Sequence, residues 1–240
     1  MLTIKNLTKT YPGGRTAVRN LSLCVESGDI YGFIGHNGAG KTTTIKCVVG
    51  IHAFDQGEIT IDGISVKENA LACKEKLAYI PDNPDLYEYL TGIQYLNFLA
   101  DIFGISSRER EKLIAQEADA FEMTEALGDL ISSYSHGMKQ KLAIIGALIH
   151  TPKLLVLDEP FVGLDPSAAL TLKTKMHELC EKGGAIFFST HVLEVAEKLC
   201  NKVAIIKDGE LIASGLTREL TGGETLEAVF MEVVGNAKTD

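Results

Sequence analysis

The sequence predicts an α/β fold in which a mostly parallel sheet forms the core, preceded by N-terminal antiparallel strands and interrupted by a helical insertion. Three observations carry this prediction. Apolar runs typical of buried strands are followed by helical patterns, β-rich runs at 2–30 are separated by turn signals, and residues 86–150 follow helical spacing. The chain has 240 residues, which is enough for one large domain.

The first part of the chain is predicted to form strands and hairpins. The turn sequences YPGG and ESGD divide residues 2–30 into antiparallel strands. A buried-strand pattern, IYGFIG, runs directly into a glycine-rich loop, and Asp62-Gly63 between two β-prone runs predicts a hairpin. The run LAYIP at 77–81 is another short strand, closed by its proline.

The middle of the chain is predicted to be helical. Ser106 and Glu109 form the pattern of a capping box before a charged helix at 107–121. A helix before it is indicated by apolar residues at helical spacing: Tyr95, Phe98, Leu99 and Ile102.

Strand patterns return in the last part of the chain. KLLVLDEP at 153–160 and AIFFST at 185–190 are each followed by a helical pattern, and Asp208-Gly209 predicts a terminal hairpin. We therefore expect one domain over 1–240, with a core formed by 1–85 and 151–220, a helical subdomain at 86–150 and a C-terminal tail at 221–240.

Composition excludes several classes of protein. The net charge of −9 argues against a nucleic-acid-binding surface, which needs clustered Lys and Arg. The five cysteines form no C-x-x-C pair, so neither a disulfide framework nor a zinc site is indicated. The N-terminus has no signal-peptide pattern, and no uninterrupted run reaches the roughly 20 apolar residues of a membrane-spanning helix. We expect a cytoplasmic protein without a nucleic-acid partner.

The glycine-rich loop carries the clearest chemical signal. Residues 35–42 fit G-x-x-x-x-G-K-[ST], the Walker A pattern, between a strand and a helix, where backbone N–H groups and the helix N-terminus bind phosphate. Lys41 is expected to bridge the β- and γ-phosphates, Thr42 to bind Mg²⁺ and Thr43 to contact a phosphate. A glycine-rich turn without a ligand is the alternative. The expected nucleotide-binding residues are Gly35, His36, Asn37, Gly38, Ala39, Gly40, Lys41, Thr42 and Thr43.

The strand in LLVLDEP ends in two carboxylates. Asp158 at its C-terminal end is positioned for Mg²⁺, because open α/β sheets bind ligands at that edge. Glu159 is the natural candidate to polarise an attacking water. A helix-capping carboxylate is the alternative, and the nearby phosphate loop argues against it. Together the two motifs predict a P-loop NTPase core.

Beyond these motifs, residues 1–220 resemble the ATP-binding subunit of ABC transporters, with the motifs in the family's order. FVGLDP resembles the family's D-loop, which implies that Asp165 lies near a dimer interface. FFSTHVLEVAE resembles its switch region, which implies that His191 reaches the γ-phosphate. Tyr11 stands where the family has an aromatic residue that stacks on adenine, and a turn tyrosine beside Pro12 explains it equally well.

The segment SYSHGMKQK at 133–141 resembles a variant of the family signature L-S-G-G-Q. Ser135 is a suitable N-cap, and Gly137 leaves its N–H free to approach an anion at a helix N-terminus. The resemblance implies that both contact the γ-phosphate of ATP held by a second, head-to-tail subunit. A helix cap alone also explains Ser135. His136 and Met138 replace the consensus glycine and glutamine.

A second departure lies after the strand AYIP, where Asp82 replaces the family's glutamine. A carboxylate still accepts hydrogen bonds from a metal-bound water, so we keep Asp82 as a candidate for sensing Mg²⁺. The signature variant, with YIPDNPDLYEYLT upstream, resembles the branch that powers export-type permeases for antibiotics, bacteriocins, lipids or ions.

The sequence therefore predicts an ATPase that converts ATP and water to ADP and phosphate, with Glu159, His191 and Lys41 as catalytic residues and ATP and Mg²⁺ as cofactors. The resemblance implies a second ATPase subunit, identical or paralogous, and a separate integral membrane permease, with the chain bound at the cytoplasmic face of the membrane. The permease is expected to contact the helical subdomain and the loop around Asp82.

Two other classes stay open. A soluble ABC-type ATPase acting on ribosomes or DNA usually carries two ATPase domains or a long coiled-coil insertion, and this chain shows neither. A GTP-binding switch needs an N-K-x-D motif, whereas Asn201-Lys202 is followed by Val and Ala.

Overall fold

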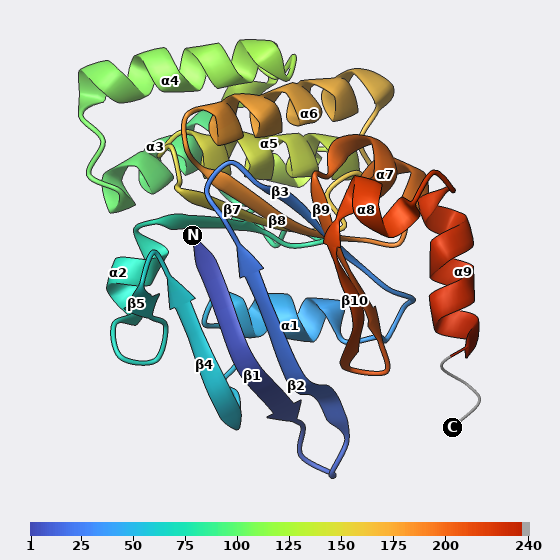
Figure 1. Cartoon of the computed structure of the whole chain (residues 1–240). Helices are drawn as coiled ribbons and strands as arrows, with labels where there is room; N and C mark the ends of the chain where they lie inside the picture. Colours follow the sequence, from blue (N-terminus) through green and yellow to red (C-terminus); the bar gives the residue numbers. More distant parts are fainter. Residues whose placement is uncertain (237–240) are drawn as a thin grey trace.

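A six-stranded, mostly parallel sheet forms the centre of the computed structural model, which describes residues 1–236 (Figure 1). Its strand order is β10-β9-β3-β8-β7-β6, and only the β9–β10 pair is antiparallel. The predicted parallel core and terminal hairpin are thus confirmed. The strands are β3 (Ile30–Ile34), β6 (Leu77–Ile80), β7 (Leu154–Asp158), β8 (Ala185–Thr190), β9 (Lys202–Lys207) and β10 (Glu210–Leu216).

The N-terminal strands form a separate antiparallel sheet in the order β2-β1-β4-β5, as the sequence predicts. Asp62 and Gly63 join β4 to β5 with positive φ angles of 52° and 77°, the conformation that a two-residue hairpin turn requires. The strands are β1 (Leu2–Thr10), β2 (Thr16–Val25), β4 (Gln56–Ile61) and β5 (Ile64–Ser65).

Helices cover the six-stranded sheet on both faces. Along β7, Leu154 and Val156 pack into the core that also holds the antiparallel sheet and α1, whereas Leu155 and Leu157 pack under α3 to α7 on the other face. The helices are α1 (Lys41–Val48), α2 (Ala70–Lys74), α3 (Gly92–Ile102), α4 (Ser107–Ala120), α5 (His136–Leu148), α6 (Pro166–Glu181), α7 (Leu193–Leu199), α8 (Thr217–Thr221) and α9 (Leu226–Asn236), with 3-10 turns η1 (Glu125–Gly128) and η2 (Ile131–Ser133).

The predicted helical subdomain contains α3, α4 and α5, and only part of the apolar spacing that indicated α3 is buried. Leu96 and Ala100 are fully buried, whereas Phe98 and Ile102 are 40% and 60% exposed. The buried side of α3 is centred on Leu96, because α3 packs on α5 through that side. Ser106 accepts a hydrogen bond from the Glu109 N–H (3.4 Å), one half of the predicted capping box.

Most of the predicted C-terminal tail is helical. Residues of the predicted tail form α9, and its last four residues, 237–240, lie outside the described residues. Within residues 1–236, no helix is both long enough and apolar enough to cross a bilayer. The division into core, helical subdomain and tail stays a prediction.

Candidate nucleotide-binding site

The glycine-rich loop connects β3 to α1 in a shape that only glycine allows at its end. Gly40 caps α1 with φ +110°, and a Cβ there would lie 2.5 Å from the Ala17 carbonyl oxygen. Gly38 also has a positive φ, +85°. These glycines let the loop fold back over the N-terminus of α1, so that backbone N–H groups and the helix dipole face one point.

A cavity of about 460 Å³ lies beside this loop and gathers residues from four segments of the chain. Tyr11 enters it from the turn after β1, and its hydroxyl lies 3.2 Å from the Thr43 hydroxyl. Asp82 enters it from the loop after β6. The lining residues are Tyr11, Arg15, Ala17, His36, Asn37, Gly38, Gly40, Lys41, Thr42, Thr43, Asp82 and Glu159.

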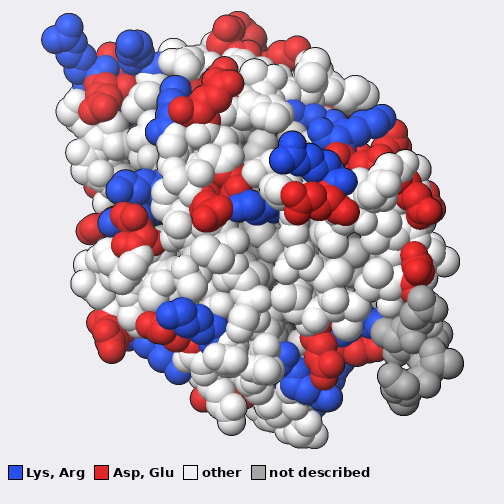
Figure 2. Space-filling view, in the orientation of Figure 1, with Lys and Arg blue, Asp and Glu red and all other residues white. Residues whose placement is uncertain are grey.

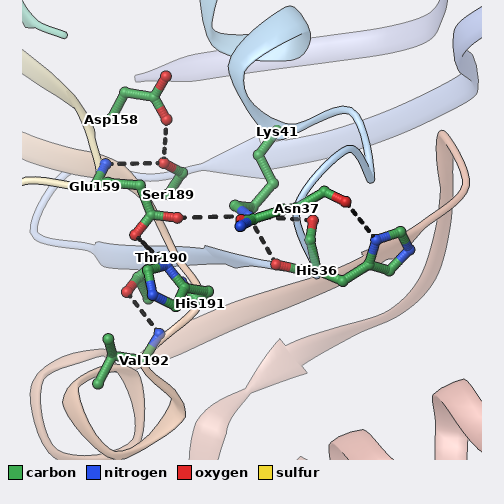
Figure 3. A network of polar contacts seen from close by, with 10 residues as sticks. His36, Asn37, Lys41, Asp158, Glu159, Ser189, Thr190, His191 and Val192 are labelled. Atoms are coloured by element: carbon green, nitrogen blue, oxygen red, sulfur yellow. Dashed lines mark hydrogen bonds and ion pairs between the residues drawn. The ribbon is translucent and has the colours of Figure 1, made fainter. Parts of the chain in front are cut away.

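A buried cation, a carboxylate and an imidazole form a chain at the edge of this cavity (Figure 3). Lys41 is only 6% exposed; its Nζ donates to the Gly35 carbonyl (2.7 Å) and lies 3.5 Å from Glu159 Oε1. The other Glu159 oxygen lies 2.9 Å from His191 Nδ1 and accepts the His191 backbone N–H (3.3 Å). The structure therefore brings together the three residues predicted to be catalytic.

Glu159 is held in an unusual backbone conformation. Its φ is +50°, and a non-glycine residue in this left-handed region costs on the order of 1 to 3 kcal/mol. Its N–H donates to both the Ser189 carbonyl (3.2 Å) and the Ser189 hydroxyl (3.1 Å), which holds the strained turn in place. The turn aims the carboxylate toward Lys41 rather than along β7 (Figure 3).

Asp158 is more deeply buried than Glu159, and one of its carboxylate oxygens has no hydrogen-bond partner among the described residues. The Ser189 hydroxyl donates to its Oδ1, and the Thr42 hydroxyl is near enough to lower the pKa of the carboxyl. Burial raises the pKa of Asp158, and the nearby charges of Asp82 and Glu159 add to the rise, while the hydroxyls of Ser189 and Thr42 lower it. Oδ2 is buried and has no partner among the described residues. A cation bound at Oδ2 would offset both the cost of burying this carboxylate and the lack of a partner for Oδ2.

This donor set fits Mg²⁺. Mg²⁺ prefers oxygen ligands and usually binds proteins through one or two carboxylates, keeping waters and phosphate oxygens for the rest. Thr42 and Asp158 supply one hydroxyl and one carboxylate oxygen side by side. Within residues 1–236 no group of three His, Cys, Asp or Glu side chains is placed to hold a metal alone, so an ion here would depend on the phosphates.

The signature residues lie away from this cavity in the same chain. Ser135 caps α5, accepting the Met138 N–H (3.3 Å), and its side chain is exposed. Gly137 follows in the first turn of the helix and is half-buried. Neither lines the cavity around Lys41.

Sequence reasoning missed three residues that support the site. Ser189 holds both Asp158 and Glu159, because the parallel register of β7 and β8 sets it opposite Asp158, and that register is no local sequence signal. Arg15 lines the cavity just after the turn that carries Tyr11. Asp208 lies 3.6 Å from His36 Nε2, at the tip of a hairpin remote in sequence.

Comparison with known proteins gives consistent matches. The sequence profile of the family described as "ABC transporter" matches residues 18–162. The linearmycin resistance ATP-binding protein LnrL of Bacillus subtilis is 35% identical over 99% of this chain and 77% of its own length. The ABC-type transporter ATP-binding protein EcsA of the same organism is 36% identical over 92% and 89%. A solved structure described as the ATP binding subunit of an ABC transporter has a TM-score of 0.93 at 33% identity and covers 98% of this chain and 99% of that one.

Proposed function

This chain belongs to the ABC transporter family of ATP-binding proteins, and we propose that it is the ATP-hydrolysing subunit that drives a separate membrane permease. The observation that carries the proposal is the Lys41–Glu159–His191 chain at the mouth of the phosphate-loop cavity. Lys41 can bind phosphate and the adjacent Glu159 can orient water. This arrangement suits a site that hydrolyses a nucleotide better than a site that only binds one.

In the proposed reaction, the chain's own groups position ATP and water. The loop N–H groups and Lys41 bind the phosphates, and Tyr11, which lines the cavity, is assigned to the base. Thr42 and Asp158 would hold Mg²⁺, which supplies positive charge to the phosphate oxygens. Glu159 accepts a hydrogen bond from the attacking water, and His191 fixes the Glu159 carboxylate. Phosphoryl transfer needs mostly such positioning and charge stabilisation.

We assign Ser135 and Gly137 to the nucleotide of a second subunit. The N-terminus of α5 is exposed at Ser135 and lies outside the chain's own cavity, which supports a contact with another chain. An exposed helix N-terminus attracts phosphate. The arrangement suits two chains closing head-to-tail, and it is compatible with an identical or a paralogous partner.

The permease is assigned to a groove between the core and the helical subdomain. This groove, of about 370 Å³, is lined mainly by apolar side chains, among them Ile51, Tyr95 and Phe103. Next to it, Tyr89 is 75% exposed and Phe98 40% exposed. Exposed apolar clusters of this kind mark sites for protein partners.

The loop after β6 joins the two sites. Pro81, Pro84 and Asp85 line the groove, while Asp82 in the same loop lines the nucleotide cavity. A change at the phosphates that moves Asp82 would therefore move one wall of the groove. This shared loop supports coupling between hydrolysis and the permease.

We propose export as the direction of transport and the cytoplasmic face of the membrane as the location. One relative at 35% identity is named a linearmycin resistance ATP-binding protein, and resistance to a compound suits its extrusion. On the face that Figure 2 shows, Lys and Arg side chains of the described residues alternate with Asp and Glu, unlike a nucleic-acid-binding surface.

The function is tested by purifying the tagged chain from membranes of its native host, with its partners untagged. We expect an integral membrane protein to co-purify and Mg²⁺-dependent hydrolysis of ATP that Lys41→Ala abolishes. Recovery of ribosomes or DNA instead would contradict the transport role. Stronger competition by GTP than by ATP would contradict the assigned nucleotide.

A further inference from the structure

We propose that His136 is a positioning residue that holds the 161–165 loop against helix α5 and thereby helps Ser189 to keep Glu159 in place. This inference rests on the proposed function, and it concerns the residue that replaces the signature's consensus glycine. A glycine at this position has no side chain with which to make the contact described next.

The His136 ring lies directly against Gly163. A Cβ on Gly163 would lie 2.7 Å from His136 Cδ2 and 3.0 Å from Nε2, so no side chain fits between them. The φ of Gly163 is +82°, which favours glycine independently. On the next residue, a Cβ at Gly137 would lie 2.9 Å from the Gly163 carbonyl oxygen. The loop backbone therefore rests on the first turn of α5.

A second contact ties the far end of the loop to the same helix. Lys141 Nζ lies 2.8 Å from Asp165 Oδ2, and the Lys141 side chain is 12% exposed. Asp165 also accepts the Ala168 N–H (2.9 Å) and so caps α6. The 161–165 loop is held at its middle by His136 and at its end by Lys141.

The beginning of this loop is connected to Glu159. The Val162 N–H donates to the Glu159 carbonyl (3.2 Å), and Glu159 itself is in the strained left-handed conformation. A strained turn keeps its shape only while its surroundings hold it. Displacement of Gly163 from α5 would therefore loosen the Val162 contact and leave the strained backbone of Glu159 held by Ser189 alone.

The consequence is a path between the two nucleotides of the proposed dimer. Ser135 and Gly137 would contact the nucleotide of the second subunit, and His136 between them contacts the loop that holds this chain's own Glu159. Closure on one nucleotide would then press the loop into place at the other site. His136 acts through Glu159 and does not touch the reacting atoms of its own chain.

The test compares His136→Ala and His136→Phe with His177→Ala, which removes another exposed histidine, on α6. We expect His136→Ala to lower kcat about tenfold with KM within about twofold, because small displacements of a catalytic group cost rate rather than binding. His136→Phe keeps a ring over Gly163 and should restore most of kcat. His177→Ala should match the wild type. A His136→Ala enzyme with wild-type kcat would overturn the proposal.

A second measurement does not depend on activity. Hydrogen exchange of a peptide spanning 161–165 should accelerate at least about threefold in His136→Ala, because the loop loses its contact with the His136 ring. It should remain unchanged in His177→Ala. Thermal unfolding of both variants checks that they are folded. Unchanged exchange overturns the role of His136 even if the wild type hydrolyses no ATP. Absence of ATP hydrolysis together with faster exchange overturns the proposed function alone.

Discussion

The ammonium group of Lys41 lies 3.5 Å from the carboxylate of Glu159, although the two side chains have different partners in the proposed reaction. Lys41 is assigned to the phosphates and Glu159 to water. Both side chains are largely buried, 7% and 16% exposed, so the attraction between them is screened less than at the surface. An incoming γ-phosphate therefore competes with Glu159 for Lys41.

Replacing Glu159 with Gln should keep ATP binding and stop turnover. Glutamine has nearly the same shape but carries no charge, so it neither polarises water nor competes with phosphate for Lys41. We expect kcat to fall by at least about 10²-fold and an ATP-dependent dimer to accumulate, as measured by phosphate release and size-exclusion chromatography. Near-normal hydrolysis by this variant would refute the role of Glu159.

Two substitutions distinguish the role of the Tyr11 ring from the role of its hydroxyl. Tyr11→Phe removes only the contact with Thr43 and should change ATP affinity by less than about threefold. Tyr11→Ala removes the ring and should weaken ATP binding by about 1 to 2 kcal/mol if the ring stacks on adenine. Inorganic triphosphate, which has no base, is the control ligand. Equal loss of triphosphate binding would show that Tyr11 only shapes the loop.

Much of the site is visible in the sequence because its signals are local. The phosphate loop and the Asp-Gly turns depend on glycines at fixed spacing, so a short window contains the whole signal. Ser189 and Asp208 reach the site through strand pairing and hairpin docking, which no local window contains. The backbone of Glu159 is likewise set by Ser189 from another strand.

The partial exposure of the apolar residues on α3 has a similar cause. The spacing of the apolar residues on α3 forms one stripe, which contains Tyr95, Phe98, Leu99 and Ile102. Apolarity alone does not show whether a side chain packs in the core of the chain or stays exposed at an interface. Leu96 took the buried position, and Phe98 was left 40% exposed. An interface residue and a core residue look alike in sequence.

The proposed permease groove is tested by placing a charge at Phe98, beside it. Phe98→Glu should leave the fold and the ATPase activity of the isolated chain within about twofold of the wild type, because the side chain is already 40% exposed. It should abolish co-purification with the membrane partner. Leu170→Glu, at a 67% exposed position on α6 outside the groove, is the matched control. Retained co-purification by Phe98→Glu would move the interface elsewhere.

The Lys141–Asp165 pair gives a pH dependence of known sign. The hydrogen bond from Lys141 lowers the pKa of Asp165 below its ordinary 3.8. The contribution of the pair is therefore present above about pH 4 and is lost as the pH falls through the lowered value. Asp165 is half-exposed and screened, so Lys141→Met should cost at most about 1 kcal/mol at pH 7.

Urea unfolding of wild type and Lys141→Met at several pH values measures this difference. The gap between the two curves should be constant from pH 7 to pH 5 and narrow below pH 4. A gap that widens on acidification would contradict the assigned ion pair. Lys198→Met, in an exposed pair with Glu194 on α7, serves as a control with no connection to the loop.

The five cysteines should react with alkylating reagents in a fixed order. Cys24 is exposed, whereas Cys47 and Cys200 are buried. Burial raises the pKa of the Cys47 thiol to about 11 and raises that of Cys200 as well, so neither forms much thiolate near neutral pH. Iodoacetamide labelling of the folded protein at pH 8, read by mass spectrometry, should modify Cys24 first. Equally fast labelling of Cys200 would contradict its burial.

The packing beneath the phosphate loop determines when, during synthesis of the chain, the candidate nucleotide site can form. The Gly209 N–H donates to the Ala39 carbonyl (2.9 Å), and a Cβ at Gly209 would lie 2.8 Å from the Ala17 carbonyl oxygen. The β9–β10 hairpin is therefore the floor of a loop that leaves the ribosome far earlier. Since synthesis proceeds from the N-terminus, a nascent chain with a complete glycine motif still lacks a finished candidate nucleotide site until its last strands emerge.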